Sequence, residues 1–342
     1  MKTGTKFWCA VGFLALVHTL VIFAGFFAPY DYRSQDRLHP FAPPARLHMV
    51  DCSGKFHIRP FVYALKDSGP DFGSYAEDCS QPLPLRFFIR GDGYMLLGTF
   101  HGNLHLFGVD APEHVFFMGS DGFGRDQLSR LLYGGQVSLF AGLVAAILAL
   151  AGALLVGAVS GLYGGLADDA LMRLAEVGIA VPSFYLLLAV RSFLPLRTGP
   201  FAAFLLVVGI IGFLSWARPA RLVRGVVLSG RERNFVLAAR GFGASRSYLL
   251  RRHLMPMTFR VIVTQMAVLV PQFILAEVLL SFFGLGIGEP FPSWGNMLAY
   301  AQQYHVVVSY GWMLLPGLIL LPVILAYHTL ADALQENLKL SN

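Results

Sequence analysis

Long apolar stretches, separated by shorter polar segments, dominate most of the chain. Six of these stretches are long enough to cross a bilayer core of about 30 Å as helices. They cover roughly residues 7–29, 136–162, 170–194, 200–216, 257–283 and 312–330. Pro182 falls inside the third stretch and is expected to kink it. The pattern predicts an all-α polytopic membrane protein with six transmembrane helices.

The first apolar stretch follows two lysines, Lys2 and Lys6. It is longer than the core of a secretory signal peptide, which has about 7–15 residues, and no small-residue cleavage pattern follows it. Basic residues ahead of a first span favour retention of the N-terminal segment on the cytoplasmic side. We therefore expect an uncleaved span with a cytoplasmic N-terminus, and six spans then place the C-terminus on the same side.

Residues 30–118 interrupt the apolar pattern with mixed charges, prolines and short alternating runs. The run LRFFIRGDGYMLLGTFHGNLHLFGV predicts two or three short β-strands around a turn at Arg90-Gly91-Asp92-Gly93. Because the first span runs outward, this segment is expected to be a small β-containing extracytoplasmic insertion. The predicted organisation is a transmembrane helix at 1–29, the insertion at 30–118 and a membrane core at 119–342.

Two cysteines of the insertion, Cys52 and Cys79, are permitted to form a disulfide in an oxidising compartment, but the sequence leaves their pairing open. His101 and His105 share one face of a predicted strand. Two histidines are too few for a closed metal site, and no cysteine or acid accompanies them at ligand spacing. We expect a surface pair in a hairpin and no metal.

The segment GSDGFGRDQLSRLLYGG, residues 119–135, predicts a loop followed by a short amphipathic helix at the outer membrane surface. The apolar face of that helix carries Leu128, Leu131 and Leu132. The charged residues Arg125, Asp126 and Arg130 lie elsewhere on it. Farther on, glycines recur every four residues at Gly157, Gly161 and Gly165, a spacing that lets another helix approach closely. Packing within this chain is favoured over a dimer interface.

Between the fourth and fifth stretches, residues 218–256 hold nine arginines and one acid, Glu232. They supply most of the net charge of +6, so this charge needs no nucleic acid as a partner. Loops rich in arginine are retained on the cytoplasmic side. The small residues Ala238, Ala239 and Gly243 favour a surface that a soluble protein grips, with arginines binding its carboxylates. Attraction of the arginines to anionic lipid is an equally strong alternative.

This loop resembles the EAA motif of permease subunits of ABC importers, in which two alanines, a glycine and a proline stand at fixed offsets. Ala238 and Ala239 match the alanines, Gly243 the glycine and Pro256 the proline. Leu237 stands where glutamate is usual, and His253 and Met255 also depart from the pattern. The resemblance implies a helix that docks on a separate ATPase subunit. The coupling residues that it implies are Leu237, Ala238, Ala239, Arg240, Gly243, Ala244, Ser245 and Pro256.

Two further blocks extend the resemblance to the dipeptide and oligopeptide branch of these permeases. Residues 119–135 are similar to its GTDxxGRDxxSRxxxG block, with Ser120 in place of threonine. Residues 275–298, LAEVLLSFFGLGIGEPFPSWGNML, are similar to its stretch after the fifth helix. The resemblance implies the type I importer permease fold and the second permease of such a system, here with an enlarged periplasmic insertion.

The resemblance further implies a subunit of the bacterial inner membrane that imports peptides or similar solutes. Its partners would be a second permease, two ATPase subunits or domains, a solute-binding protein and membrane lipid. The chain has no GxxxxGK[ST] motif, so ATP and magnesium would be bound by the partner subunits, with no cofactor and no catalysis in this chain. An ATP-independent channel or a secondary transporter is the alternative.

Glu277 is the one carboxylate deep in an apolar stretch, and Gln272 lies five residues before it. A charge buried at membrane depth normally faces a cavity or a partner. Both residues are therefore candidates to line or brace a translocation path. A structural hydrogen bond from Glu277 to a neighbouring helix is the competing interpretation.

Overall fold

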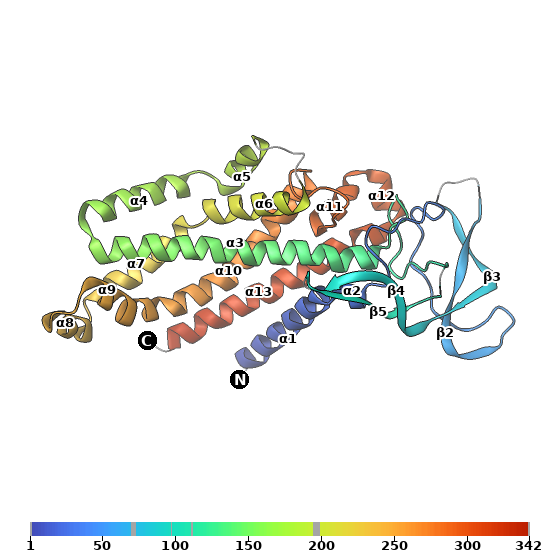
Figure 1. The fold of residues 1–342 in the computed structure, drawn as a ribbon, viewed down its shortest axis with the longest axis horizontal. Helices are drawn as coiled ribbons and strands as arrows, with labels where there is room; N and C mark the ends of the chain where they lie inside the picture. Colours follow the sequence, from blue (N-terminus) through green and yellow to red (C-terminus); the bar gives the residue numbers. More distant parts are fainter. Residues whose placement is uncertain (1, 70–72, 97, 111, 194–198, 341–342) are drawn as a thin grey trace. The chain divides into compact units, whose positions relative to one another are not determined.

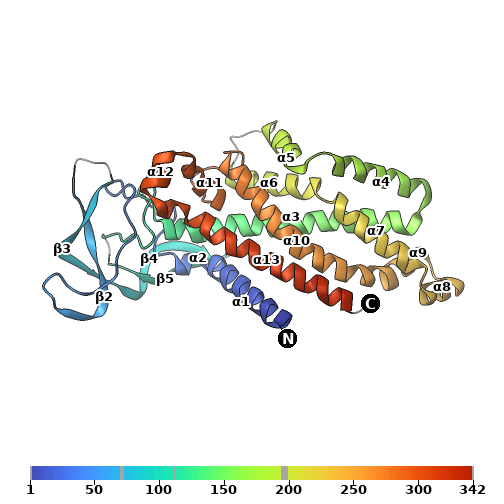
Figure 2. The same cartoon turned by 180° about the vertical axis from the view of Figure 1, so that it is seen from behind.

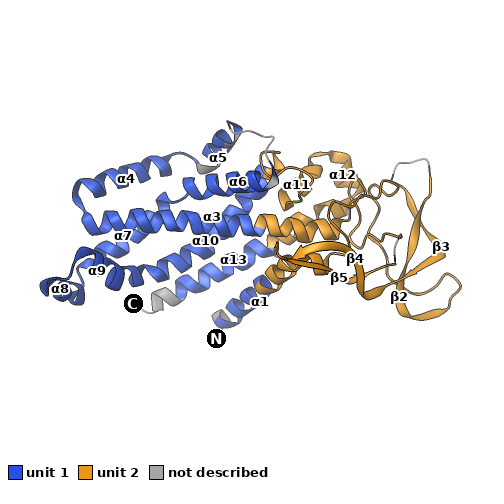
Figure 3. Ribbon diagram, viewed as in Figure 1, with its two compact units in different colours: residues 1–14, 139–280, 322–342 blue, residues 15–138, 281–321 orange. Residues whose placement is uncertain are grey.

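The computed structural model describes residues 2–69, 73–96, 98–110, 112–193 and 199–340. The chain divides into two compact units, which Figure 3 distinguishes by colour. Unit 1 comprises Met1–Leu14, Leu139–Leu280 and Pro322–Asn342, and unit 2 comprises Ala15–Ser138 and Ser281–Leu321. Unit 1 is helical, whereas unit 2 combines helices with all the strands of the described chain.

The helices of unit 1 include four that continue into unit 2 (Figures 1 and 2). These four are α1 (Lys2–Ile22), α3 (Gln127–Tyr163), α10 (Met255–Phe282) and α13 (Leu315–Leu340). The helices that lie within unit 1 are α4 (Gly165–Ala180), α5 (Ser183–Ser192), α6 (Pro200–Leu214), α7 (Ala217–Arg231), α8 (Asn234–Gly241), α9 (Arg246–Leu249) and a π-helical turn (Leu250–Leu254).

In the described chain, four helical stretches are long and apolar enough to cross a membrane. They are Gly4–Ile22, Gln127–Tyr163, Arg246–Phe282 and Gly311–Glu336. A fifth span results if α6 and α7, which meet at a bend of 46°, are counted as one. These findings confirm a helical multi-pass protein, and the count of six spans stays a prediction.

The difference from six spans lies in the predicted third span, residues 170–194. Here α4 ends at Ala180 and α5 begins at Ser183, so the helix is interrupted rather than kinked. Val181 adopts an extended conformation, with φ −83° and ψ 128°. Proline disfavours the helical conformation of the residue before it, and Pro182 therefore explains the break. The predicted end of this span, at residue 194, lies outside the described residues.

Two of the regularly spaced glycines bring α3 and α7 together within unit 1. A Cβ atom on Gly157 would lie 2.5 Å from the carbonyl oxygen of Ala220, and one on Gly161 would lie 2.8 Å from Cβ of Val227. A side chain at either position would push the two backbones apart. Packing within the chain, the favoured interpretation of this spacing, therefore accounts for both glycines.

The strands of unit 2 form two antiparallel arrangements (Figure 1). A three-stranded sheet has the order β1 (His48–Val50), β2 (Phe56–Asp67) and β3 (Tyr75–Pro84), and β4 (Arg86–Leu96) pairs with β5 (Phe100–Gly108). Cys52 and Cys79 form a disulfide that links the turn before β2 to β3. The remaining helices of unit 2 are short: α2 (Ala24–Phe27), α11 (Trp294–Leu298) and α12 (Tyr304–Ser309), with 3-10 turns at Ala299–Gln302 and Gly311–Leu314.

The hairpin of β4 and β5 confirms the predicted strands but not the predicted turn. Arg90-Gly91-Asp92-Gly93 lies inside β4, where the register shifts between Arg90 and Tyr94. The chain reverses later, where the N–H of Thr99 donates to the carbonyl of Leu96 at 3.1 Å. A Cβ atom on Gly91 would lie 3.0 Å from the imidazole of His105. The glycine therefore accommodates a bulge beside a buried ring rather than a turn.

His105 corrects the expectation of a surface histidine pair. It is 2% exposed, and its ring nitrogens lie 2.6 Å from the carbonyl oxygen of Ala28 and 2.9 Å from that of Asp92. His101 remains exposed on the same strand. Because both ring nitrogens of His105 contact backbone carbonyls, its role is to join β4 and β5 to the end of α2.

The charged residues of segment 119–135 correct a second expectation. Instead of a short surface helix, the segment leads into the long helix α3, and Arg125 and Arg130 are 3% and 0% exposed. Arg125 donates to Asp121 at 2.7 Å and to both oxygens of Glu289 at 2.6 and 3.1 Å. Arg130 donates to Glu289 at 2.9 Å. Within unit 2, the two buried arginines bind the exposed Glu289 and so join the sequence blocks at 119–135 and 275–298.

Asp126 lies next to Arg125 and is also buried. The N–H and hydroxyl of Ser129 both donate to its carboxylate at 2.7 Å. Burial nevertheless dominates and raises the pKa of Asp126 to about 6. Desolvation disfavours the charged carboxylate more than two hydrogen bonds favour it.

Candidate functional site

The arginine-rich segment 218–256, expected to join two spans and to carry a helix around Ala238 and Ala239, is mostly helical. Its first part is α7, which buries Ala220, Val223 and Val227 on one face. Because apolar residues recur every three to four positions between the arginines, this face packs as an amphipathic helix. In the sequence, the arginines between these apolar residues obscured the helical pattern of α7.

Two of the arginines of α7 are held within unit 1. Arg224 binds Asp168 of α4 through two hydrogen bonds of 2.6 and 2.5 Å, and Ser160 also donates to this carboxylate. Arg231 donates to the carbonyl of Gly161 at 3.3 Å. These contacts fasten α7 to α4 and to the end of α3.

The following helix, α8, ends in a glycine cap. The N–H of Ala244 donates to the carbonyl of Ala239 at 3.1 Å, and that of Gly243 donates to the carbonyl of Arg240 at 3.0 Å. This pair of bonds is the Schellman arrangement, which requires a left-handed residue after the helix. Gly243 has φ +85°, a conformation that glycine adopts without steric cost. The glycine of the motif is therefore explained by the geometry of the helix end.

Ser245 and Pro256 shape the turn into α10. The Ser245 side chain caps α9 by accepting the N–H of Tyr248 at 3.3 Å. Pro256 does not end the segment as expected, because the helix is continuous from Arg246 to Phe282. Instead a π turn at Leu250–Leu254 precedes the proline. Proline has no N–H for the carbonyl four residues earlier, and a wider turn accommodates this loss.

Beneath α8 and α9 lies a small apolar core within unit 1. Its buried members are Val223, Val227, Val236, Leu249 and Leu254. Ala239 and Ala244 pack against it from α8 and the glycine cap. The two predicted alanines therefore lie in different environments, because Ala239 packs on this core whereas Ala238 is exposed. Small residues here bring α8 close to α7 and α10.

The opposite side of the segment is an exposed surface, which we call the coupling surface after the role that the EAA resemblance implies. It carries the apolar residues Phe235, Leu237, Ala238, Phe242 and Tyr248 and the exposed arginines Arg233, Arg240, Arg246, Arg251 and Arg252. Phe242 is 93% exposed. Figures 1 and 2 show α8 at the end of unit 1, beside α7 and α9. Exposed apolar residues rimmed by charge are typical of a protein interaction site.

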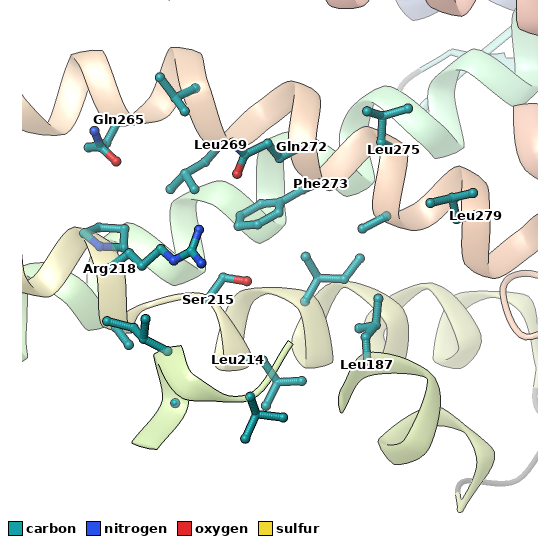
Figure 4. Close-up of a pocket in the computed structure, with 18 residues that line it drawn as sticks. Leu187, Leu214, Ser215, Arg218, Gln265, Leu269, Gln272, Phe273, Leu275 and Leu279 are labelled. Carbon is teal, nitrogen blue, oxygen red and sulfur yellow. The ribbon is translucent and has the colours of Figure 1, made fainter. Parts of the chain in front are cut away.

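A second feature of unit 1 is a cavity of about 430 Å³ between α10 and the bend from α6 to α7 (Figure 4). Its walls are largely apolar and include Leu187, Leu214, Leu269, Phe273 and Leu279. Four polar side chains complete its lining, namely Ser215, Arg218, Gln265 and Gln272. The size is within the range of about 300–1,000 Å³ for small-molecule sites.

The cavity separates the two residues predicted for a translocation path. Gln272 lines it, whereas Glu277 is fully buried and does not belong to the lining. Pro271 stands inside α10 directly before Gln272. Its missing N–H removes one helix hydrogen bond at the level of the cavity. Sequence reasoning missed Arg218 and Ser215, because it assigned the bend between α6 and α7 to the edge of a loop.

Comparison with known proteins relates the helical part of the chain to transport proteins. Residues 153–340 match the family described as binding-protein-dependent transport system inner membrane component. The dipeptide transport system permease protein DppC of Bacillus subtilis is 36% identical over 228 residues, 66% of this chain and 69% of its own length. The oligopeptide transport system permease protein OppC of Escherichia coli is 35% identical over 226 residues, which cover 66% of this chain and 72% of that protein. The oligopeptide transport system permease protein OppC of Bacillus subtilis is 33% identical over 242 residues, which cover 70% of this chain and 76% of that protein.

Proposed function

Because the chain belongs to the family of binding-protein-dependent transport system inner membrane components, we propose that it is the second permease subunit of an ATP-driven importer of peptides or peptide-like solutes. The named relatives are dipeptide and oligopeptide permeases, which supports peptides as the solute class. Membership in a binding-protein-dependent family argues against an ATP-independent channel or a secondary transporter.

The coupling surface is the observation that carries this proposal. It presents an apolar patch with arginines around it, on a helix that a glycine cap and a buried core hold in place. We assign it to an ATPase subunit whose carboxylates bind the arginines. Leu237 occupies the position of the usual glutamate and is 44% exposed, so an apolar contact takes the place of one polar contact.

Coupling then follows from the connection between this surface and the membrane helices. α8 and α9 pack on the same apolar core as α7 and α10, so displacement of the surface moves these helices with it. ATP binding favours the closed ATPase pair, and the helices exchange inward-open for outward-open states. The free energy comes from the different ATP affinities of those states. This chain contributes no catalytic residue, and the ATPase subunits bind ATP and magnesium.

The proposed topology has six spans, with both termini and the coupling surface on the cytoplasmic side of a bacterial inner membrane. α4 and α5 together would form the third span, interrupted at Pro182. The strands of residues 48–108 would lie outside, where the disulfide between Cys52 and Cys79 is chemically stable. A second permease, two ATPase subunits or domains and a solute-binding protein complete the assembly.

Co-purification from the native membrane tests the proposal. A tagged chain is expected to bring down an ATPase and a second permease, and Ala238→Glu should remove the ATPase alone. Ala238 suits this test better than Ala239, which packs on the core. Ser229→Glu, on the exposed side of α7, is the matched control. Recovery of the chain without an ATPase, or equal recovery with both variants, contradicts the proposal.

A further inference from the structure

Arg218 is the charged side chain among the residues that line the cavity, and it is exposed. Trp216 lies beside Gly152 of α3, and Ala220 lies beside Gly157. With a rise of 1.5 Å per residue, Arg218 is therefore about 10–15 Å inside the end of α3 at Tyr163. This level falls within the uncharged apolar run 139–159 of that helix. Arg218 is an exposed arginine at this level of α3, beside largely apolar walls, which makes it a candidate functional residue.

The arginines of α7 differ in what they contact. Arg224 is paired with Asp168, and Arg231 contacts Gly161 and Glu232. Among the residues that the structure describes, Arg218 forms an ion pair with none. Its guanidinium extends into the cavity, with Ser215 on one side and Gln272 on the other (Figure 4). A guanidinium that lines a largely apolar cavity without an ion-pair partner in the described chain is available to bind an anion.

The surroundings of Arg218 define the class of anion. One guanidinium provides a fork of N–H donors that matches a carboxylate, and the Ser215 hydroxyl and the two glutamine amides can hydrogen-bond polar groups next to it. The rest of the wall is aliphatic or aromatic. A small solute with one carboxylate, amide groups and apolar side chains fits this combination. A multiply charged anion would lack further cations in the lining.

We propose that Arg218 binds a carboxylate of the transported solute on its way through the cavity. The identity of this solute as a peptide rests on the proposed function, but the anion preference of the cavity does not. A single charged contact would hold the solute without trapping it. Transport requires binding that is strong enough for entry and weak enough for release.

A reporter thiol at Gln272 tests the anion preference in the assembled importer. Gln272→Cys is made with Cys9→Ser, so that no other free thiol of the described chain reacts. The reagents are methanethiosulfonates with an ethylsulfonate or an ethyltrimethylammonium group. The ratio of the anionic to the cationic rate is expected to fall about tenfold with Arg218→Gln, because the positive charge of Arg218 acts oppositely on the two reagents.

The matched control is Arg221→Gln, an exposed arginine one turn farther along α7 that does not line the cavity. It should leave the ratio within twofold of its starting value. An unchanged ratio in Arg218→Gln, an equal change in Arg221→Gln, or a thiol that neither reagent reaches overturns the proposal. Gln265→Cys repeats the measurement from the other polar position on α10 if Gln272→Cys fails to assemble.

Uptake then separates this proposal from the proposed function. Trialanine and trialanine amide are compared in vesicles that hold the complete importer, each rate divided by its occupancy of the binding protein. Arg218→Gln should lower uptake of trialanine about tenfold and that of the amide less than twofold, and Arg218→Lys should restore part of the loss. If the unmodified importer takes up neither, the peptide assignment fails while the thiol ratio still decides the role of Arg218. Equal losses for both peptides contradict carboxylate binding.

Discussion

The glycine cap of α8 permits a quantitative test with two neighbouring glycines. Gly243 has φ +85°, and an L-residue in this left-handed conformation costs about 1–2 kcal/mol. Gly241 is the last residue of α8, and a Cβ atom there meets no atom of the described chain within 4 Å. Alanine at 241 is expected to stabilise the helix by up to about 1 kcal/mol. The same substitution thus has opposite signs two residues apart.

Hydrogen exchange of the amides of Gly243 and Ala244 measures this difference directly, since both donate the bonds that close the cap. An opening free energy lower by about 1–2 kcal/mol speeds their exchange by about 5–30-fold in Gly243→Ala. Gly241→Ala should slow the exchange or leave it unchanged. The measurement uses mass spectrometry of a peptide over residues 234–248 in the purified complex. Equal protection in the two variants would refute the role assigned to the cap.

Two further predictions concern buried carboxylates. Asp168→Asn should destabilise the complex by about 1–3 kcal/mol, because it removes the charged partner of the partly exposed Arg224. Thermal unfolding of the complex measures this loss. A similar loss in Asp169→Asn, at the exposed neighbouring position, would contradict the prediction. Asp126, whose pKa of about 6 in the folded state is above that of an unfolded aspartate, keeps its proton between about pH 4 and 6 while the unfolded chain releases one. Stability should therefore fall by up to about 3 kcal/mol as the pH rises through this window. Proteolytic resistance of unit 2 should show this slope, Asp126→Asn should abolish it, and exposed Asp67→Asn should retain it.

Local patterns predicted the elements whose causes are local. The alternation in residues 85–109 predicted two or three strands, and β4 and β5 lie there. The resemblance to the EAA motif implied a helix at Ala238 and Ala239, which is α8. The four-residue glycine spacing predicted the close approach that Gly157 makes with α7. In each case the residues that determine the structure are neighbours in the chain or lie on one helix face.

Contacts between distant residues explain what the sequence did not predict. Arg125 and Glu289 are 164 residues apart, so the charged residues of segment 119–135 looked water-facing in the sequence although Arg125 and Arg130 are buried. Arg224 and Asp168 are 56 residues apart, so the sequence did not show that this arginine has a partner, and α7 was assigned to a basic loop. The bulge around Gly91 depends on His105 from the opposite strand. The cavity itself needs α6, α7 and α10 together, which no single stretch specifies.

The helix from Arg246 to Phe282 is weakened at two places, the π turn before Met255 and Pro271 beside the cavity. Between them lies an unbroken stretch of about 16 residues, roughly 24 Å long. This stretch is a helical segment between two weak points. One weak point lies under the coupling surface, and the other lies beside Gln272. A helical segment of this kind transmits displacement along its axis, while the weak points allow rotation at its two ends. In the coupling proposed above, a displacement of α8 would reach the cavity wall as a shift in the position of Gln272, without bending of the apolar stretch between the two weak points.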